Sequence, residues 1–274
     1  MGTAWSQDGA SQSEASGQQK QQSATEPHPS TYTVKGAYNT VEVKPSDNVD
    51  KTVVKPTEQK IPHNFQAILK DANGFRMDKS STEEKFGQLR AGILLNQKRK
   101  ASLFNISSTI LWQKYWVDKN FNNCFMLYSR DLSICWVDDC RYWQWTSVKE
   151  TSDEFVDVAE LLNVCWLEIN GKFDTAELSP GILYEVAYVV MLKDPAYGWE
   201  VPVNIRLTLP DGSKQENKVN LMEKVRGQWI KIPVGEFKTP VQKHGEIEFS
   251  MYEYVDGEWK SGLCIKGVTI QPKN

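Results

Sequence analysis

Apolar and polar residues alternate along much of the C-terminal half of the chain. Between residues 201 and 209, five aliphatic residues take every second position, and polar residues or Pro202 fall between them. Residues 246–251 repeat this pattern. A period of two places one face of a β-strand in the core and the other in water. Further apolar stretches of strand length lie at 124–128, 163–169, 182–192, 229–234 and 263–270. The second half of the chain is therefore predicted to be rich in strands.

Turn signals separate these stretches. Asn170-Gly171, Asp211-Gly212 and Asp256-Gly257 are dipeptides that favour tight hairpins. Pro202 marks a strand start or a sheet edge, because proline cannot donate to the ladder. Short strands with turns every 8–15 residues predict an all-β fold, an antiparallel, jelly-roll-like β-sandwich over residues 114–274.

Residues 80–98 have a helical rather than a strand pattern. Ser80 with Glu83 has the spacing of a capping box, and so does Ser81 with Glu84. The apolar residues share one face at helical spacing: Phe86, Leu89, Ile93 and Leu94. We predict a short helical segment within residues 63–113 that docks on the sandwich or on a partner. Residues 101–113 form an apolar, β-branched segment without turn residues, for which an intron-like remnant, an alternative strand and a partner-binding segment all stay open.

The N-terminal part of the chain has a different composition. Residues 1–60 contain no Leu, Ile or Phe, whereas 23 of the 30 aromatic residues lie in 111–274. Such a segment cannot bury enough apolar area to offset a backbone entropy cost of about 1–2 kcal/mol per residue. We therefore predict that residues 1–62 form a disordered tail. The chain shows neither an apolar secretory signal nor an apolar run near 18 residues, so no membrane association is expected.

Charge and cysteine content limit the chemistry. The formal net charge is −3, which gives no overall basic excess for nucleic acid. The cysteines form no CxxC pair and no Cys–His cluster, so neither a metal site nor a cofactor is expected: Cys124, Cys135, Cys140, Cys165 and Cys264. Without a secretory signal, reduced thiols are the default, although a surplus thiol would cross-link chains under oxidising conditions.

Motifs of common enzymes are absent. The sequence contains no GxSxG, no P-loop and no HExxH, and His244 is the single histidine of the predicted sandwich. We expect a protein without enzymatic activity. A two-carboxylate glycosidase is the remaining enzymatic alternative, since acidic pairs are frequent.

Residues 130–145, RDLSICWVDDCRYWQW, concentrate three tryptophans and one tyrosine within ten positions. If Asp138-Asp139 turns the chain, Trp136 and Trp143 can meet across a hairpin. Two open indole rings would form an apolar platform whose electron-rich faces attract the C–H face of a pyranose. Polar neighbours would serve the sugar hydroxyls, with Tyr142, Asp138 and Arg141 as auxiliary contacts. The alternative is that these tryptophans belong to the core, as we expect for Trp145.

The whole C-terminal part resembles a known family. After residues 130–145 come VCWLEINGKF, LSPGILYEVAYVV, AYGWEVPV, LPDGSKQE, RGQWIKIPVGEF, GEIEFSMYEY and WKSGLCIKGVTIQP. From about Cys124 to the end, this pattern resembles the phloem protein 2 family, plant lectins related to the tobacco leaf agglutinin (Nictaba-like) type. The resemblance implies a β-sandwich lectin, without enzymatic activity, that binds N-acetylglucosamine oligomers such as chitooligosaccharides, and also N-glycan cores.

The resemblance also implies site residues. The family's two binding tryptophans correspond to Trp136 and Trp143, and its acidic sugar contacts to Glu246 and Glu253. Residues seven apart in a regular strand face opposite ways, so a bulge or a strand end must lie between the two glutamates.

Further expectations from the resemblance concern partners and location. They are a homodimer in the cytoplasm of phloem companion cells and sieve elements, with the nucleus as a second location, and a role in defence or wound response. The alternatives are a structural phloem protein joined by disulfides to the phloem filament protein, and an RNA-associated phloem protein. Intermolecular disulfides would use Cys124, Cys135 or Cys140, and RNA would contact the basic tail, because residues 111–274 carry a net charge of −6.

Overall fold

The computed structural model describes residues 61–70, 72, 82–95, 113–152, 154–242, 244–255 and 257–273. Within these residues the chain forms two short helices, two 3-10 turns and thirteen strands. The predicted disordered tail, apart from Ile61 and Pro62, and the apolar segment 101–113, apart from Gln113, lie outside the described residues. Among the described helices, neither is long and apolar enough to cross a membrane.

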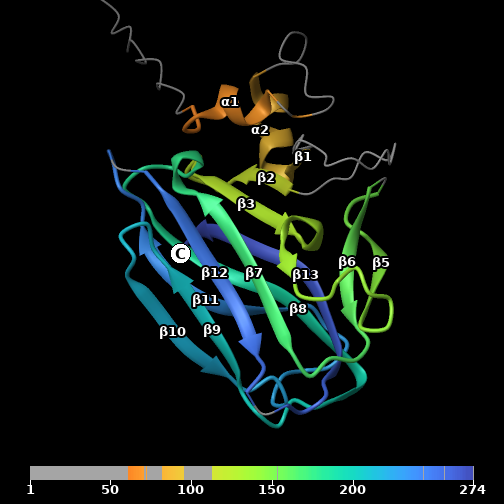
Figure 1. The fold of residues 1–274 in the computed structure, drawn as a ribbon. Helices are drawn as coiled ribbons and strands as arrows, with labels where there is room; N and C mark the ends of the chain where they lie inside the picture. Colours follow the sequence, from red (N-terminus) through yellow and green to blue (C-terminus); the bar gives the residue numbers. More distant parts are fainter. Residues whose placement is uncertain are drawn as a thin grey trace, which may run out of the picture. The chain divides into compact units, whose positions relative to one another are not determined.

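The strands form two sheets, and every pairing between named strands is antiparallel (Figure 1). The eight-stranded sheet contains β1 (Ile93–Leu95), β2 (Gln113–Val117), β3 (Asn123–Tyr128), β5 (Trp143–Lys149), β6 (Phe155–Leu161), β8 (Leu183–Tyr197), β11 (Ile230–Lys238) and β13 (Ser261–Pro272). The five-stranded sheet has the order β10 (Lys214–Val219), β9 (Val203–Thr208), β12 (Glu246–Glu253), β7 (Leu167–Asp174) and β4 (Ser133–Ile134). The predicted all-β class and antiparallel sandwich are confirmed.

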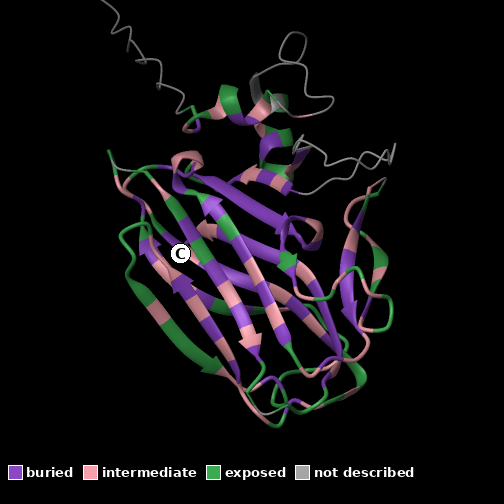
Figure 2. Cartoon of the chain, in the orientation of Figure 1, coloured by how far each residue is buried: buried purple, intermediate pink, exposed green. Residues whose placement is uncertain are grey.

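The core lies between the two sheets. Buried and more exposed residues alternate along β7, β9 and β12, as the period of two predicts (Figure 2). Tyr188 of β8 reaches across the core, donates a hydrogen bond of 2.8 Å to the carbonyl of Ile169 in β7, and meets the ring of Phe249 edge-on at 6.1 Å. The outer face of the five-stranded sheet is therefore left to polar side chains.

The dipeptide Asn170-Gly171 does not form the predicted hairpin. Strand β7 runs straight through it, and Gly171 pairs with Phe249 of β12. A Cβ atom at position 171 would lie 2.2 Å from the Phe249 ring. Glycine is thus required here for close packing and not for a turn. The Asp211-Gly212 turn is confirmed, since Leu209 and Ser213 close the hairpin between β9 and β10 with a 2.9 Å hydrogen bond.

The helix predicted for residues 80–98 is shorter than expected. Helix α2 (Thr82–Ala91) buries Leu89, but it ends before Gly92, whose φ of 96° breaks the helix. Ile93 and Leu94, expected on the helical face, lie instead in β1, which pairs with β2 and joins the eight-stranded sheet. The predicted capping residues Ser80 and Ser81 lie outside the described residues.

The preceding helix is also attached to the sandwich. Just before α1 (Phe65–Leu69), the chain is held by Asn123, whose side-chain amide donates to the carbonyls of His63 and Glu177 at 2.7 Å each. The two 3-10 turns, η1 (Ser129–Asp131) and η2 (Thr175–Glu177), follow β3 and β7 directly.

Candidate functional site

Aromatic side chains from three separate loops surround one open cleft, which we call the aromatic cleft. Its volume is about 500 Å³. The lining residues are Cys135, Trp136, Tyr142, Val164, Cys165, Trp166, Glu168 and Trp259. Three of them expose large apolar area to solvent, with Trp136, Trp166 and Trp259 being 58%, 45% and 48% exposed. Exposed tryptophans gathered in one hollow indicate a ligand-binding surface.

Trp136 projects from a tight turn that follows β4. Its φ of 64° lies in the left-handed region, which is unfavourable for a bulky residue. Backbone hydrogen bonds from Asp139 to Trp136 (3.0 Å) and from Trp143 to Asp139 (3.1 Å) enforce this geometry. Its ring meets Tyr142 edge-on at 6.1 Å. Strain that is retained at an exposed tryptophan points to a function for that side chain.

Trp143 does not form an exposed pair with Trp136, so that prediction is wrong. Trp143 starts β5, is only 2% exposed, and packs in the core. Its indole N–H donates a 3.0 Å hydrogen bond to the carbonyl of Cys135, the residue directly before Trp136. The buried ring therefore holds the turn that carries the exposed one. Trp145, expected in the core, is half-buried beneath Arg130, whose guanidinium lies 3.5 Å from the ring centroid.

The three auxiliary residues belong to the same turn, and of them Tyr142 lines the cleft. Asp138 is exposed, and Tyr142 is the partly buried neighbour of Trp136. Arg141 is bound to Asp139 at 2.6 Å, and the side-chain hydrogen bonds from Arg141 lower the pKa of Asp139 to about 2. This exposed ion pair fixes the shape of the turn and keeps the Asp139 carboxylate charged at physiological pH.

The second wall of the cleft was not predicted from the sequence. Trp166 stacks on Tyr254 with ring centroids 4.3 Å apart and planes 13° from parallel, and Tyr254 stacks in turn on Tyr252. The Trp166 indole N–H donates a 2.9 Å hydrogen bond to Glu168. A signal was present, because Trp166 has the polar parity of β7, opposite to the apolar positions Leu167 and Ile169.

Trp259 is anchored by a buried ion pair. Lys260, fully buried, forms a salt bridge with Glu253, which is 2% exposed. The backbone of Lys260 also exchanges hydrogen bonds of 2.7 and 3.0 Å with Val164 across the cleft. The pair thus fixes the loop between β12 and β13 that presents Trp259.

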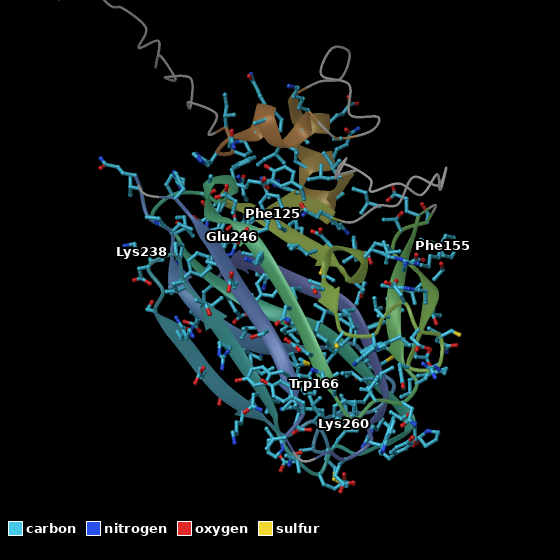
Figure 3. The ribbon with its side chains drawn as sticks, viewed as in Figure 1. Phe125, Phe155, Trp166, Lys238, Glu246 and Lys260 are labelled. Atoms are coloured by element: carbon cyan, nitrogen blue, oxygen red, sulfur yellow. The ribbon has the colours of Figure 1, made fainter. Side chains whose placement is uncertain are left out.

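The two glutamates predicted as sugar contacts do not meet at this site. Glu253 is sealed in its ion pair with Lys260, so it is not available to a sugar. Glu246 is exposed but begins β12 at the far end of the strand from Trp166, bound to Lys172 at 2.9 Å (Figure 3). No register shift separates the two glutamates in β12, so they face opposite sides of the sheet. The cleft's own carboxylate is Glu168.

The three cysteines predicted to cross-link chains differ in exposure. Cys124 is buried, and burial raises the pKa of its thiol to about 12. Cys135 is partly buried at the cleft, where burial and the charge of Glu168 raise its pKa. Cys140 is exposed and is the best placed of the three for a disulfide with another chain. Among the described residues, no group of His, Cys, Asp and Glu is arranged to hold a metal ion.

Solved structures with a similar arrangement are distant. The CBM22-1 xylan-binding domain of Xyn10C from Paenibacillus barcinonensis is 11% identical with a TM-score of 0.31, covering 53% of this chain and 87% of that domain. TmCBM61, solved in complex with β-1,4-galactotriose, is 12% identical with a TM-score of 0.30 over 52% of this chain and 87% of that one.

Sequence relatives are much closer. Protein PHLOEM PROTEIN 2-LIKE A1 of Arabidopsis thaliana is 47% identical over 223 residues, 80% of this chain and 85% of that protein. A lectin of Luffa acutangula is 45% identical over 218 residues, 79% of this chain and 97% of that protein. The family model described as phloem protein 2 matches residues 122–272, which include both sheets of the sandwich apart from β1 and β2. The chain belongs to the phloem protein 2 family.

Proposed function

We propose that this protein is a phloem lectin that binds N-acetylglucosamine oligomers, both chitooligosaccharides and N-glycan cores, in the aromatic cleft. The observation that carries the proposal is the convergence of Trp136, Trp166 and Trp259, all exposed, around the carboxylate of Glu168. The relative named a lectin, similar over most of both chains, supports the same class of ligand.

The chemistry of the cleft suits an acetylated amino sugar. The faces of indole rings attract the C–H face of a pyranose, and they accommodate the acetamido methyl group equally well. Glu168 already accepts hydrogen bonds from Trp166 and Asn170, but a carboxylate has about four acceptor positions and can still receive sugar hydroxyls. The cleft is therefore polar at one point and apolar around it.

The orientation of the rings limits the entropy lost on binding. The Trp166 ring is held by its stack on Tyr254 and its hydrogen bond to Glu168, and the Trp136 ring is held edge-on against Tyr142. Such preorganised side chains lose little rotamer freedom when a ligand docks. Because the site is open, the expected affinity is micromolar to millimolar, roughly −4 to −8 kcal/mol.

Calorimetric titration with chitotriose tests the proposal. Trp136→Ala should weaken binding by about tenfold or more, because it removes a stacking face. Trp229→Ala is the matched control, since Trp229 is also exposed but lies outside the residues that line the cleft. Equal affinity of Trp136→Ala and the unmodified protein would refute the proposed site, and failure of the unmodified protein to bind would refute the proposed function.

A second candidate function is a disulfide cross-link to another phloem protein, such as the filament protein. It is favoured by one observation, the exposure of Cys140. RNA association through the tail and homodimerisation stay predictions.

A further inference from the structure

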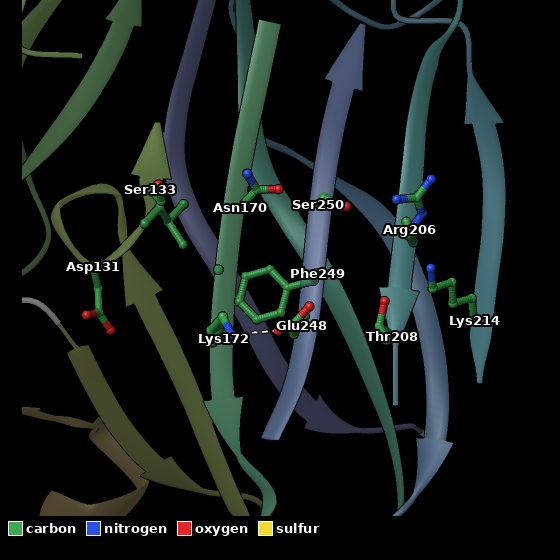
Figure 4. A pocket seen from close by; sticks show the side chains of 12 residues that line it. Asp131, Ser133, Asn170, Lys172, Arg206, Thr208, Lys214, Glu248, Phe249 and Ser250 are labelled. Carbon is green, nitrogen blue, oxygen red and sulfur yellow. Dashed lines mark hydrogen bonds and ion pairs between the residues drawn. The ribbon is translucent and has the colours of Figure 1, made fainter. Parts of the chain in front are cut away.

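A second hollow, which we call the polar groove, crosses the outer face of the five-stranded sheet. Its volume is about 620 Å³, larger than that of the aromatic cleft. The lining side chains include Ser133 of β4, Asn170 of β7, Ser250 of β12, and Arg206 and Lys214 of β9 and β10 (Figure 4). None of the residues predicted from the sequence as sugar contacts lies in it.

Strand register places the groove's polar side chains in rows across the sheet. Ser133 pairs with Asn170, Asn170 with Ser250, and Ser250 with Arg206. Thr208 and Glu248 form part of the next row. Strands lie about 4.8 Å apart, so a row from β4 to β10 is about 19 Å long. The small side chains in the middle leave a channel that is much longer than one pyranose ring.

The groove is close to electrically neutral. Lys172 is held between Glu246 and Glu248, at 2.9 and 2.6 Å. Arg206 is bound to Glu216 at 2.6 Å and donates to the Tyr252 hydroxyl at 2.6 Å. Cations that are paired in this way do not select an anionic ligand. They offer donors next to acceptors, which is the combination that neutral hydroxyl groups require.

Other groups in the groove retain their hydrogen-bonding capacity. Within the part of the chain that the structure describes, no side-chain hydrogen bond uses the hydroxyls of Ser133, Thr208 or Ser250, or the ammonium of Lys214. These groups and the paired charges together form a surface for a ligand with many hydroxyls.

The polar groove continues the aromatic cleft. Glu168 lines the cleft and accepts a 3.1 Å hydrogen bond from Asn170, which lines the groove. These two residues are two positions apart in β7, about 7 Å along the strand. Ser133 of β4 lines the groove, and Trp136, three positions later in the turn that follows β4, lines the cleft.

We propose that the polar groove binds further sugar units of a neutral oligosaccharide whose first units occupy the aromatic cleft. The inference rests on the proposed function of the cleft. It assigns a new contact surface on β7, β12, β9 and β10, in which Asn170, Ser250 and Lys214 bind hydroxyl or acetamido groups. Affinity should then rise as the oligomer becomes longer than the cleft.

Titration of a length series from chitobiose to chitohexaose tests this proposal. Ser250→Tyr fills the channel, and Lys214→Ala removes one donor, while Lys218→Ala is the matched control on the same strand outside the groove. We expect the first two variants to weaken chitohexaose binding by about two- to tenfold, the equivalent of one or two hydrogen bonds, and to leave chitobiose within twofold. Urea unfolding verifies that Ser250→Tyr is folded.

The outcomes separate the groove from the cleft. Affinity that does not increase with length, or groove variants that match Lys218→Ala at every length, would overturn the groove and leave the cleft intact. An equal loss for short and long oligomers would also overturn it, because the groove would then not be an extension. Absence of binding at every length would overturn both proposals.

Discussion

Trp136 and Trp143 lie seven residues apart in one aromatic segment, and the structure gives them opposite roles. Trp143 is 2% exposed and Trp136 is 58% exposed. Replacing Trp143 by Phe keeps an apolar ring but removes the indole N–H that binds the Cys135 carbonyl at 3.0 Å. The pair therefore separates a buried residue that holds the turn from an exposed residue that we propose contacts the sugar.

The expected magnitudes follow from burial. In Trp143→Phe, a partly buried carbonyl loses its partner and a small void opens in the core, which costs about 1–3 kcal/mol of unfolding free energy. The Trp136 turn keeps its backbone hydrogen bonds, so the variant can lose no more binding energy than one hydrogen bond provides, about tenfold in affinity at most. Trp136→Ala should change unfolding by about 0.5 kcal/mol or less, since its side chain is exposed.

The assay combines urea unfolding with chitotriose titration on both variants. We expect Trp143→Phe to be less stable but to bind, and Trp136→Ala to be stable but to lose binding. If Trp143→Phe kept full stability and lost all binding, Trp143 would be a direct ligand contact and the reasoning from burial would be refuted.

Three further predictions concern the residues around the cleft. Lys260→Met should lower the unfolding free energy by about 3–5 kcal/mol in urea melts, because Glu253 then stays buried without its cation. The double variant Lys260→Met, Glu253→Leu should recover most of that loss, whereas additive losses would argue against the ion pair. In the same urea melts, the unfolding free energy of Trp136→Gly should exceed that of Trp136→Ala by about 1 kcal/mol, since only glycine adopts a φ of 64° without strain. The reverse order would show that the turn relaxes in the alanine variant. In alkylation followed by mass spectrometry at pH 8, the exposed Cys140 should react first. Burial raises the pKa of Cys124 to about 12 and that of Cys264 to about 11, so both stay as unreactive thiols. Early labelling of Cys124 would contradict its buried position.

Much of the fold could be predicted from the sequence, because alternation of apolar residues reports which strands have one buried face. The errors arose where one residue type serves two purposes. Gly171 resembles a turn residue but allows the Phe249 ring to approach, and Gly92 ends a helix that apolar spacing alone would extend through Ile93. The role of each glycine cannot be predicted from its sequence neighbours, because it depends on a strand that lies beside it in the fold.

The candidate site was harder to predict because it is assembled from distant segments. The exposed Trp136 was identified, but strand parity alone could not show which face of β5 is buried, so Trp143 was placed on the wrong side. Trp166 and Trp259 reach the cleft from loops more than 25 residues away in sequence. The pairing of β7 with β4 and β12, together with the bridge between Val164 and Lys260, brings these segments together.

A crystal structure of the protein with chitotriose bound would test the central claim most directly. The account predicts a pyranose face against the exposed ring of Trp136 or Trp166, with a sugar hydroxyl within hydrogen-bond distance of Glu168. Sugar bound instead beside Glu246, or on the eight-stranded sheet with the aromatic cleft empty, would contradict it.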